Sequence, residues 1–181
     1  MQFKPLDPEF RLEGERVYLR PITGLDTNMV LAWRNAPFVT EHFFYRKPIS
    51  VSEHEKWLSD KVAQGLVYQF IACLKEGDVP VGSVYLQHYD ESDNSMESGL
   101  FMDEKFAGGR GIATECYELM TCSFAKEVLK LSKLRARIIA DNRGSIRVHE
   151  KCGFVTKETV EEKVIPTGEF EIALQMEKII E

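Results

Sequence analysis

The chain has 181 residues, of which 44% are hydrophobic and 29% are charged. These values are typical of one globular domain and exclude disordered, collagen-like and disulfide-rich chains. The sequence contains no run of about 18 apolar residues, the length that a membrane span needs, and its net charge of −6 argues against a general nucleic-acid binder, which needs a basic face. We therefore expect a single cytoplasmic domain over residues 1–181, with no membrane or nucleic-acid partner.

The first third of the chain predicts one strand and two helices. A strand is indicated where apolar and polar residues alternate, and Asp26 is placed to cap the helix that follows. Ser52 and Glu55 have the spacing of a capping box at the start of the second helix. Two prolines bound the segment between the helices, which favours a loop. In chain order, we expect an arm (1–10), a strand (15–20), a helix (26–35), a long loop (36–49) and a helix (52–64).

From residue 67 onward the pattern favours strands. A short turn between the first two apolar runs predicts a hairpin. Further along, the longest helical pattern lies between two strands, and such a crossover is right-handed and makes the two strands parallel. The predicted fold is mixed α/β, with a mostly antiparallel sheet of about six to seven strands flanked by helices. The expected strands are 67–74, 81–89, 96–102, 134–140, 154–165 and 170–178, and the expected helices are 111–128 and 145–151.

The cysteines and histidines show no pattern of metal ligands. No two cysteines form a C-x-x-C pair, and each lies in an apolar, periodic stretch, so we expect free, buried thiols. The histidines are scattered rather than spaced as ligands, and no metal is expected. The residues concerned are Cys73, Cys116, Cys122, Cys152, His42, His54, His88 and His149.

A glycine-rich turn between a strand and the longest helix carries the clearest chemical signal. Residues 96–115 read MESGLFMDEKFAGGRGIATE. Gly108, Gly109 and Gly111 lack Cβ atoms, so the backbone there can turn tightly and approach a ligand closely. The first N–H groups of a helix lack internal partners and, together with the helix dipole, attract anions. We predict a phosphate or pyrophosphate site that matches neither a P-loop nor a Rossmann fingerprint; the alternative is an ordinary loop.

A second motif follows the next strand, where residues 142–154 read NRGSIRVHEKCGF. Together the two motifs resemble the signatures of the GNAT superfamily of acetyl-CoA-dependent N-acetyltransferases. The family's pyrophosphate signature, Q/R-x-x-G-x-G/A, is matched over 108–113, although Gly108 stands where the family prefers Gln or Arg. The resemblance covers about residues 12–178, and the run GRGIATE is similar to the branch that acetylates ribosomal-protein N-termini, polyamines and aminosugars. The later signature is matched by Asn142, Ser145, Gly153 and Phe154.

This resemblance implies acetyl-CoA as the cosubstrate. The backbone of Leu100, Phe101 and Met102 is expected to pair with the pantetheine arm like an added strand. Asn142 is expected to contact the pantetheine, and Ser145 to lie near its thiol end. The Arg110 side chain either meets the adenosine phosphate or is a solvated charge. The pyrophosphate is expected at the glycine turn and the helix start, on Gly108, Gly109, Arg110, Gly111, Ile112, Ala113 and Thr114.

The chemistry that the resemblance implies is direct attack of an amine on the thioester, with no covalent enzyme intermediate. A backbone N–H near Leu100 is expected to stabilise the oxyanion. Glu97 could draw the proton through water, with His88 and Tyr89 as rivals; alternatively, Glu97 is a surface carboxylate. His149 stands where many members have a Tyr that protonates the leaving thiolate, and it either does this work or only packs on its helix.

The acceptor is expected to lie against residues 33–58, where aromatic and basic residues are mixed. Rings can stack on a base or sugar while cations hold phosphates, which suits a nucleotide-linked aminosugar. W-R-N followed by an H-x-x-W helix also resembles acetyltransferases of the bacterial nonulosonate route, which act on a UDP-linked amino sugar. A protein N-terminus, a polyamine, another small amine and a non-catalytic acyl-CoA-binding module are alternatives, and a homodimer is compatible with the free edge of the last hairpin. The candidate acceptor residues are Arg34, Phe44, Tyr45, Arg46 and His54.

Overall fold

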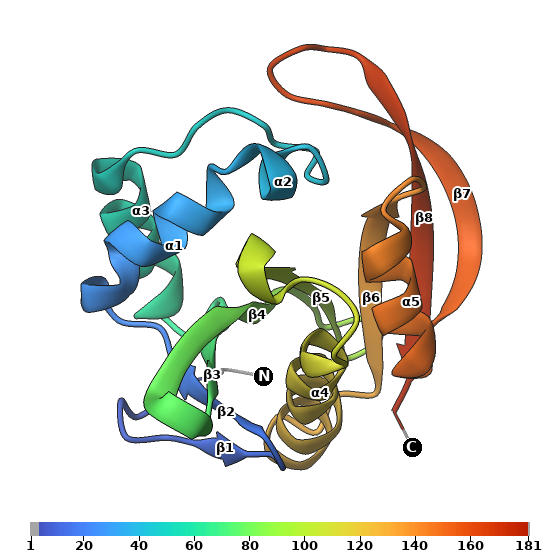
Figure 1. The fold of residues 1–181 in the computed structure, drawn as a ribbon. Coiled ribbons are helices and arrows are strands. Elements are labelled where there is room, and N and C mark those ends of the chain that lie inside the picture. The colour runs from blue at the N-terminus through green and yellow to red at the C-terminus, as the bar shows by residue number, and fades with distance from the viewer. Residues whose placement is uncertain (1–3, 181) are drawn as a thin grey trace.

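The computed structural model describes residues 4–180 and contains one eight-stranded sheet (Figure 1). The strand order is β1-β2-β3-β4-β5-β6-β8-β7, and neighbours are antiparallel except for β5 and β6. These two are parallel because the chain crosses between them through a long helical segment. The strands are β1 (Leu12–Glu13), β2 (Val17–Pro21), β3 (Tyr68–Leu74), β4 (Val79–Asp90), β5 (Ser95–Met102), β6 (Lys133–Ile139), β7 (Val155–Lys163) and β8 (Phe170–Ile179).

Helices cover both faces of the sheet. Side chains alternate along β3, so Phe70 and Ala72 join the core cluster beneath α4, whereas Ile71 and Cys73 join the cluster beneath α1. The crossover helix α4 continues into the π-helical segment η5, and α5 packs beside α4. The helices are α1 (Thr27–Arg34), α2 (Pro37–Thr40), α3 (Val51–Trp57) with its continuation η2 (Leu58–Val62), α4 (Ile112–Glu118) with η5 (Leu119–Val128), and α5 (Arg143–Lys151), with short 3-10 turns η1 (Gly24–Asp26), η3 (Glu76–Asp78) and η4 (Glu104–Phe106).

The predicted fold class and element order are confirmed, including the β3–β4 hairpin and the parallel crossover. The prediction of six to seven strands missed β1, whose two residues are too few to show an alternating pattern. The predicted loop 36–49 was wrong at its start, because α2 occupies part of it. Pro37 is the first residue of α2, a position where its missing N–H needs no partner.

The capping box of α3 lies two residues earlier than predicted. Ser50 Oγ accepts a hydrogen bond from Glu53 N at 3.3 Å, and the Glu53 carboxylate accepts one from Ser50 N at 2.8 Å. The Ser52 and Glu55 pair has the same spacing but does not form the cap. Ser50 is the residue with extended backbone at the helix start, which is the conformation that an N-cap requires.

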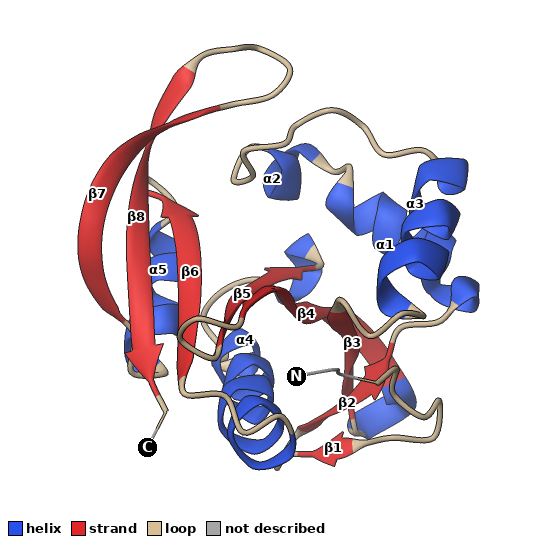
Figure 2. Ribbon diagram, turned by 180° about the vertical axis from the view of Figure 1, so that it is seen from behind, coloured by secondary structure: helices blue, strands red, loops and turns tan. Residues whose placement is uncertain are grey.

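β5 and β6 pair only from Ser95 to Glu97 and then separate. On its other side, β5 stays paired with β4 as far as Met102. The edge of residues 98–102 that faces β6 therefore has no strand partner in the described part of the chain. Seen from behind, β6, β7 and β8 diverge from the other strands (Figure 2). This separation opens the middle of the sheet.

The described part of the expected arm, residues 4–10, lies against the core. The ring centroid of Phe10 is 5.7 Å from that of Phe124, and Tyr68 Oη donates to the carbonyl of Lys4 at 2.9 Å. Residues 1–3 of the arm lie outside the described residues. No helix in residues 4–180 is long and apolar enough to cross a membrane. All four cysteines are free thiols, and Cys122 alone is only half-buried.

Candidate active site

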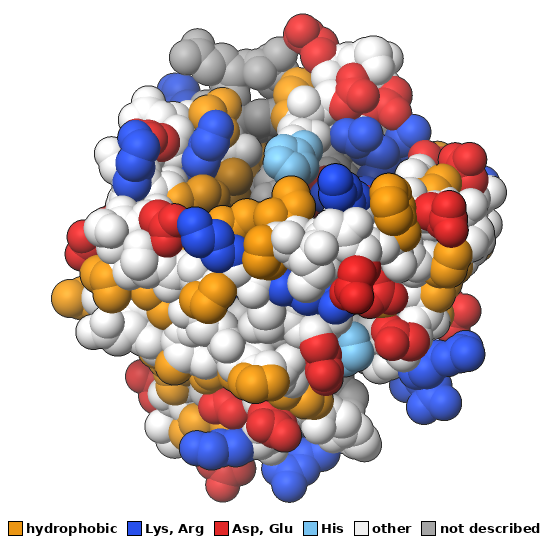
Figure 3. Space-filling model, turned by 90° about the horizontal axis from the view of Figure 1, so that it is seen from above, with side chains coloured by type: hydrophobic (Ala, Val, Ile, Leu, Met, Phe, Trp, Pro, Cys, Tyr) orange, Lys and Arg blue, Asp and Glu red, His pale blue; other side chains and the backbone are white. Residues whose placement is uncertain are grey.

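Two cavities meet where β5 and β6 separate. The glycine-loop cleft, with a volume of about 670 Å³, lies between residues 106–114 and the start of α5. The inner cavity, about 550 Å³, lies between α1, residues 42–49 and β5. In the view from above, hydrophobic, basic and histidine side chains meet around a hollow (Figure 3). The two cavities adjoin each other, because both are lined by His42, Phe43, Leu100, Phe101, Asn142 and Ser145.

The glycine-loop cleft brings together every residue that the sequence predicted for the cofactor. One wall is the end of β5, whose free backbone edge begins after Glu97. The opposite wall is the start of α5. An extended ligand can therefore lie along β5 as an added strand. The predicted residues that line the cleft are Leu100, Phe101, Met102, Gly108, Gly109, Arg110, Gly111, Ile112, Ala113, Thr114, Asn142 and Ser145.

The glycine turn has the left-handed backbone that its glycines allow. Gly108, Gly109 and Gly111 have φ values of 95°, 76° and 73°, and a Cβ atom added at Gly108 or Gly109 would meet nothing within 4 Å. The turn therefore borders open space. The N–H groups of Ile112 and Ala113 precede the first hydrogen bond of α4, which runs from Glu115 N to Gly111 O at 3.0 Å, and so have no helical partner.

Arg110 lines the cleft as expected, but its backbone N–H is not free to bind a pyrophosphate. Its N–H donates to the carbonyl of Gly108 at 3.0 Å and is used within the turn itself. The Arg110 carbonyl in turn accepts from Arg16 Nη1 at 2.8 Å. These bonds fix the shape of the turn, so the amides left to a ligand are those of the helix start.

The charge of the glycine-loop cleft suits an anion. Its lining includes one acidic side chain, Asp141. Asn142 caps α5, since its Oδ1 accepts a hydrogen bond from Ser145 N at 3.1 Å. This cap places both predicted α5 residues at the mouth of the inner cavity. The basic side chains that line the cleft are Arg110, Arg143, Arg147 and Lys151.

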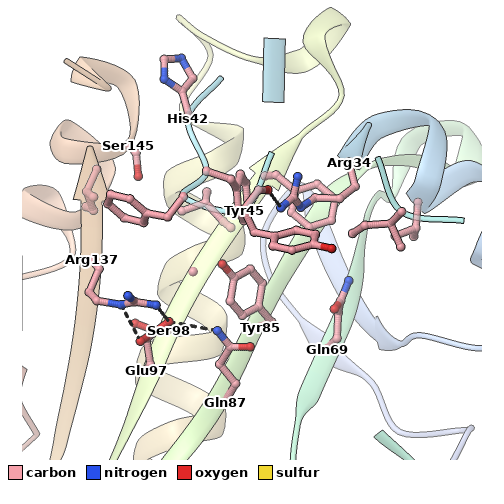
Figure 4. Close-up of a pocket in the computed structure, with 18 of the residues that line it drawn as sticks. Arg34, His42, Tyr45, Gln69, Tyr85, Gln87, Glu97, Ser98, Arg137 and Ser145 are labelled. Carbon is pink, nitrogen blue, oxygen red and sulfur yellow. Dashed lines mark hydrogen bonds and ion pairs between the residues drawn. The ribbon is translucent and has the colours of Figure 1, made fainter. Parts of the chain in front are cut away.

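The inner cavity is lined mainly by aromatic and polar side chains from both halves of the chain (Figure 4). It includes Glu97 and His149, the candidate acid–base residues, together with Leu100. The rings that line it are those of Phe43, Phe44, Tyr45, Trp57, Tyr85 and Phe101, and the four predicted acceptor residues that reach it are Arg34, Phe44, Tyr45 and His54.

Glu97 is held in a network at the base of the inner cavity. Its carboxylate accepts from Arg137 Nε at 3.0 Å and from Gln87 Nε2 at 3.0 Å (Figure 4). Burial opposes ionisation, but the charge of Arg137 and these hydrogen bonds outweigh it, so the pKa of Glu97 lies below its usual range. Arg137 also pairs with Glu162. Glu97 is therefore an ionised carboxylate whose side chain is only 16% exposed, rather than a solvated surface charge.

The two rival bases do not line either cavity. His88 is exposed, and its Nδ1 lies 3.6 Å from the Glu97 carboxylate. Tyr89 Oη donates to Asn94 at 3.2 Å, on the side of β4 that packs against the main core. Of the three candidates, Glu97 alone faces the inner cavity.

His149 is 1% exposed and packs between Tyr117 and Phe154, with ring centroids 4.5 and 5.1 Å away. Its Nδ1 lies 2.8 Å from the carbonyl of Ser145. A carbonyl only accepts, so Nδ1 carries the proton and Nε2 presents a lone pair. Burial lowers the pKa of His149 to about 4. At neutral pH the imidazole is therefore uncharged, which disfavours the predicted role of proton donor to a thiolate.

Arg46, predicted to bind the acceptor, lines neither cavity. Its Nη2 pairs with Glu171 on β8 at 3.0 Å, and its Nε donates to the carbonyl of Phe43 at 3.0 Å. The backbone of the same segment bridges to the β7–β8 hairpin, with Arg46 N donating to Ile165 O at 2.6 Å and Ile165 N donating to Phe44 O at 2.7 Å. The side chain thus anchors the segment that carries the aromatic rings, a role that the sequence did not indicate.

Three further residues line the inner cavity that the sequence did not indicate as functional, namely Tyr85, Gln87 and Arg137. Tyr85 and Gln87 alternate along β4, so they project from the same face. Burial raises the pKa of Tyr85 to about 12, so its hydroxyl stays protonated. Gln87 lies opposite Glu97 in the β4–β5 register. The alternation could have indicated these two, but only the fold brings Arg137 of β6 to the same place.

Comparisons with known proteins agree with this arrangement. Residues 16–155 match the model of the acetyltransferase (GNAT) domain family. The chain is 29% identical over 145 residues to the uncharacterised protein MJ1062 of Methanocaldococcus jannaschii, covering 78% of this chain but only 28% of that protein. It is also 29% identical over 151 residues to the Bacillus subtilis protein named "Probable N-acetyltransferase YjcK", covering 79% of this chain and 82% of that one.

Solved structures share the fold. A spermidine N-acetyltransferase from Vibrio cholerae, solved in complex with CoA and spermine, superposes with a TM-score of 0.81 at 18% identity, over 92% of this chain and 96% of that one. A GNAT-family acetyltransferase from Bacillus anthracis gives a TM-score of 0.78 at 19% identity, over 94% and 98%. With the family model matching over most of the length and the fold agreeing, the chain belongs to the GNAT acetyltransferase family.

Proposed function

We propose that this protein transfers the acetyl group of acetyl-CoA to a primary amine. The observation that supports this best is the free edge of β5, which runs from the glycine turn to a second cavity with a buried carboxylate. The open cradle at Gly108 and Gly109 and the basic lining fit a diphosphate. Acetyl-CoA supplies an activated acetyl thioester, and the amine approaches from the inner cavity.

Transfer forms a C–N bond and breaks the C–S bond of the thioester, while the amine loses one proton and the sulfur gains one. Glu97 is the group best placed to receive the amine's proton through water. Its low pKa makes it a weak base at neutral pH. Positioning of the two reactants therefore carries much of the proposed rate gain.

His149 has a different proposed role from the one first expected. Because its Nδ1–H is held by the Ser145 carbonyl, its Nε2 is an acceptor, and this atom is buried with no hydrogen-bond partner among the described residues, on a side chain that lines the inner cavity. We assign it to accept a hydrogen bond from the amine or from a pantetheine amide. A backbone N–H near Leu100 remains the proposed donor to the oxyanion.

The proposed acceptor is a nucleotide-linked aminosugar. The rings of Phe44, Tyr45 and Trp57 offer stacking surfaces for a base or sugar, and the volume of about 550 Å³ lies in the range of small-molecule sites. The carboxylate of Glu97 is paired with Arg137 and that of Glu53 caps α3, so neither carboxylate of the inner cavity is committed to a polycation such as a polyamine.

Incubation with acetyl-CoA and a panel of amines tests the proposal, with released CoA thiol as the readout. The panel contains UDP-linked aminosugars, polyamines and peptides that start with Ala or Ser. Acetyl-CoA at ten times its Kd should also stabilise the protein by roughly 1.4 kcal/mol in a thermal shift. Stabilisation without thiol release from any amine would indicate a non-catalytic acyl-CoA-binding module, and no stabilisation would contradict the cofactor site itself.

A further inference from the structure

The inner cavity contains an arginine charge that the described chain does not neutralise. Arg34 is the last residue of α1, is 9% exposed and lines the cavity. Its Nη2 donates to the carbonyl of Tyr45 at 2.9 Å, and its guanidinium carbon lies 3.7 Å from the centre of the Phe43 ring. Within residues 4–180, it forms no ion pair, and its Nη1 is buried without a hydrogen-bond partner. Such a group is costly to bury unless a ligand satisfies it.

The other charges of the cavity do not offset Arg34. The carboxylate of Glu97 is taken up by Arg137. The carboxylate of Glu53 accepts hydrogen bonds from the backbone N and the Oγ of Ser50, at 2.8 and 2.7 Å, where it caps α3. The cavity thus holds two acidic and two arginine side chains. Among the described residues neither Glu53 nor Arg34 forms an ion pair, but Glu53 is exposed to solvent and Arg34 is buried, so Arg34 is the buried charge left without a bonded counter-charge.

A second buried nitrogen lies on the same side of the cavity. His54, on α3, is 6% exposed, and its Nδ1 lies 3.1 Å from Thr27 Oγ1 of α1. Its Nε2 is buried and has no partner among the described residues. α1 and α3 pack against each other, so the α1 side of the cavity presents two unused polar groups. Glu97, by contrast, lies on β5.

We propose that the amine acceptor carries an oxyanion, a phosphate or a carboxylate, and that Arg34 binds it. This inference rests on the proposed transferase function and specifies its substrate class. A guanidinium matches the geometry of both oxyanions and binds them through charge-assisted hydrogen bonds. The acceptor then lies with its oxyanion toward α1 and its amine toward β5. A polyamine would place a cation beside Arg34, so the structure favours anionic acceptors over polyamines.

Matched acceptors that differ in one group test this directly. We compare glucosamine 6-phosphate with glucosamine, and β-alanine with propylamine, and add spermidine as a polycation. The expected result is a kcat/KM at least tenfold higher for the anionic member of one pair, and the pair with the larger ratio identifies phosphate or carboxylate. Ratios near one in both pairs, or a preference for spermidine, overturn the inference while leaving the transferase function intact.

The variant Arg34→Gln tests the same inference, because it removes the guanidinium that is proposed to bind the oxyanion. Binding of UDP and of glucosamine 6-phosphate is measured by calorimetry on protein saturated with CoA, so that the glycine-loop cleft is already filled. We expect at least tenfold weaker binding of one of these anions, a smaller loss in Arg34→Lys, and no change in CoA affinity. Arg11→Gln, which removes an exposed arginine bonded only to neighbouring carbonyls, is the matched control and should change nothing.

The same variants separate a charge role from a structural one. Loosening of residues 43–45 would lower kcat/KM for glucosamine and glucosamine 6-phosphate alike, whereas loss of the Arg34 charge lowers only the second. Equal anion binding in wild type and in folded Arg34→Gln overturns the inference, whether or not any amine is acetylated. Absence of acetylation with every amine, despite Arg34-dependent anion binding, contradicts the transferase function instead.

Discussion

The glycine-loop cleft and the inner cavity use different parts of the chain to recognise a ligand. The cleft is built from main-chain groups, namely a free strand edge, a turn of left-handed glycines and the first amides of α4. The inner cavity is built from side chains of α1, α3, β4, β5, β6 and α5. Binding through backbone groups depends on the fold and on a few glycines, so most side-chain substitutions leave it unchanged. Binding through side chains changes with each substitution, so such a site can come to accept a different ligand. The first region therefore fits a shared cosubstrate and the second an acceptor that differs between relatives.

The buried polar atoms that lack hydrogen-bond partners also distinguish the two regions. Among the described residues, the side-chain nitrogens that are buried without a partner are Arg34 Nη1, His42 Nδ1, His54 Nε2, Arg135 Nε and His149 Nε2. All but Arg135 line the inner cavity. Unpaired buried groups are costly, so their concentration in one place points to an acceptor that supplies the missing partners.

The largest expected effect comes from blocking the cleft. Gly111 borders the amides of the helix start and has a φ of 73°. Gly111→Val adds side-chain atoms beside these amides, where the added Cβ would lie 3.5 Å from Arg16 Nη2, and it strains the backbone of the turn by about 1–2 kcal/mol. We expect acetyl-CoA binding, measured by calorimetry, to fall by more than about a hundredfold, which corresponds to roughly 3 kcal/mol.

Gly77→Val is the matched control for this backbone strain. Gly77 has a φ of 77° but lies in the turn between β3 and β4, away from both cavities. It should lose a similar amount of stability and keep its affinity for acetyl-CoA. If folded Gly111→Val bound acetyl-CoA as tightly as Gly77→Val does, the diphosphate site would have to lie elsewhere.

The second effect is on stability and concerns His149. Its pKa of about 4 lies below the ordinary value of 6.5, so the unfolded chain binds a proton between these values and the folded chain does not. Above pH 6.5, His149 therefore does not make the free energy of unfolding depend on pH. As the pH drops from 6.5 toward 4, protonation of His149 in the unfolded chain lowers this free energy by up to about 3 kcal/mol. Urea unfolding at several pH values measures the slope.

His149→Asn keeps a donor for the Ser145 carbonyl but cannot titrate in this range. The variant can be less stable than wild type at pH 7. Between pH 6.5 and 4, however, its free energy of unfolding should change less with pH than that of wild type. The buried His54, whose pKa is also lowered by burial, leaves a remaining slope in both proteins. Parallel curves for the two proteins would mean that His149 is not held neutral in the folded state.

The contrast between the two regions also explains what the sequence could predict. The glycine turn and the α5 start are contiguous motifs that carry the family resemblance, and the cofactor residues that this resemblance implies all line one cleft. The inner cavity joins residues that are far apart in sequence, such as Arg34, Glu97 and Arg137. Composition singled out Arg34 and Arg46 alike as candidate acceptor residues, but it could not distinguish Arg34, which lines the inner cavity, from Arg46, which turns to Glu171.

A smaller effect is expected from Glu97→Gln. The amide can still bond to neighbours but can neither receive a proton nor carry charge. We expect kcat to fall about tenfold, which is less than the roughly hundredfold or more that is typical of proton-transfer groups, because the pKa of Glu97 is already low. Acetyl-CoA affinity should be unchanged. In wild type the carboxylate stays ionised from neutral pH down to its depressed pKa, so its contribution is lost only in acid.

Glu162→Gln is the control, because Glu162 pairs with the same Arg137 but does not line the inner cavity. It should affect kcat little. An equal fall in both variants would show that Glu97 acts only by holding Arg137. Unchanged kcat in Glu97→Gln would remove it as the base and leave positioning as the main source of catalysis.

The smallest expected effect tests how the two regions are joined. Arg46→Ala removes the ion pair with Glu171 and the bond to the Phe43 carbonyl, leaving the backbone bridge to Ile165 in place. A partly exposed pair contributes at most about 1 kcal/mol, so the aromatic segment should loosen without unfolding. The acceptor KM should rise about fivefold or less, with CoA affinity unchanged, because Arg46 lies away from the glycine-loop cleft.

Glu171→Gln should give a similar rise in the acceptor KM. The double variant should add little to the effect of either single variant, since the two side chains act as one pair. Additive effects would instead mean that Arg46 meets the acceptor itself, which would restore it to the recognition surface and make that surface extend beyond the inner cavity.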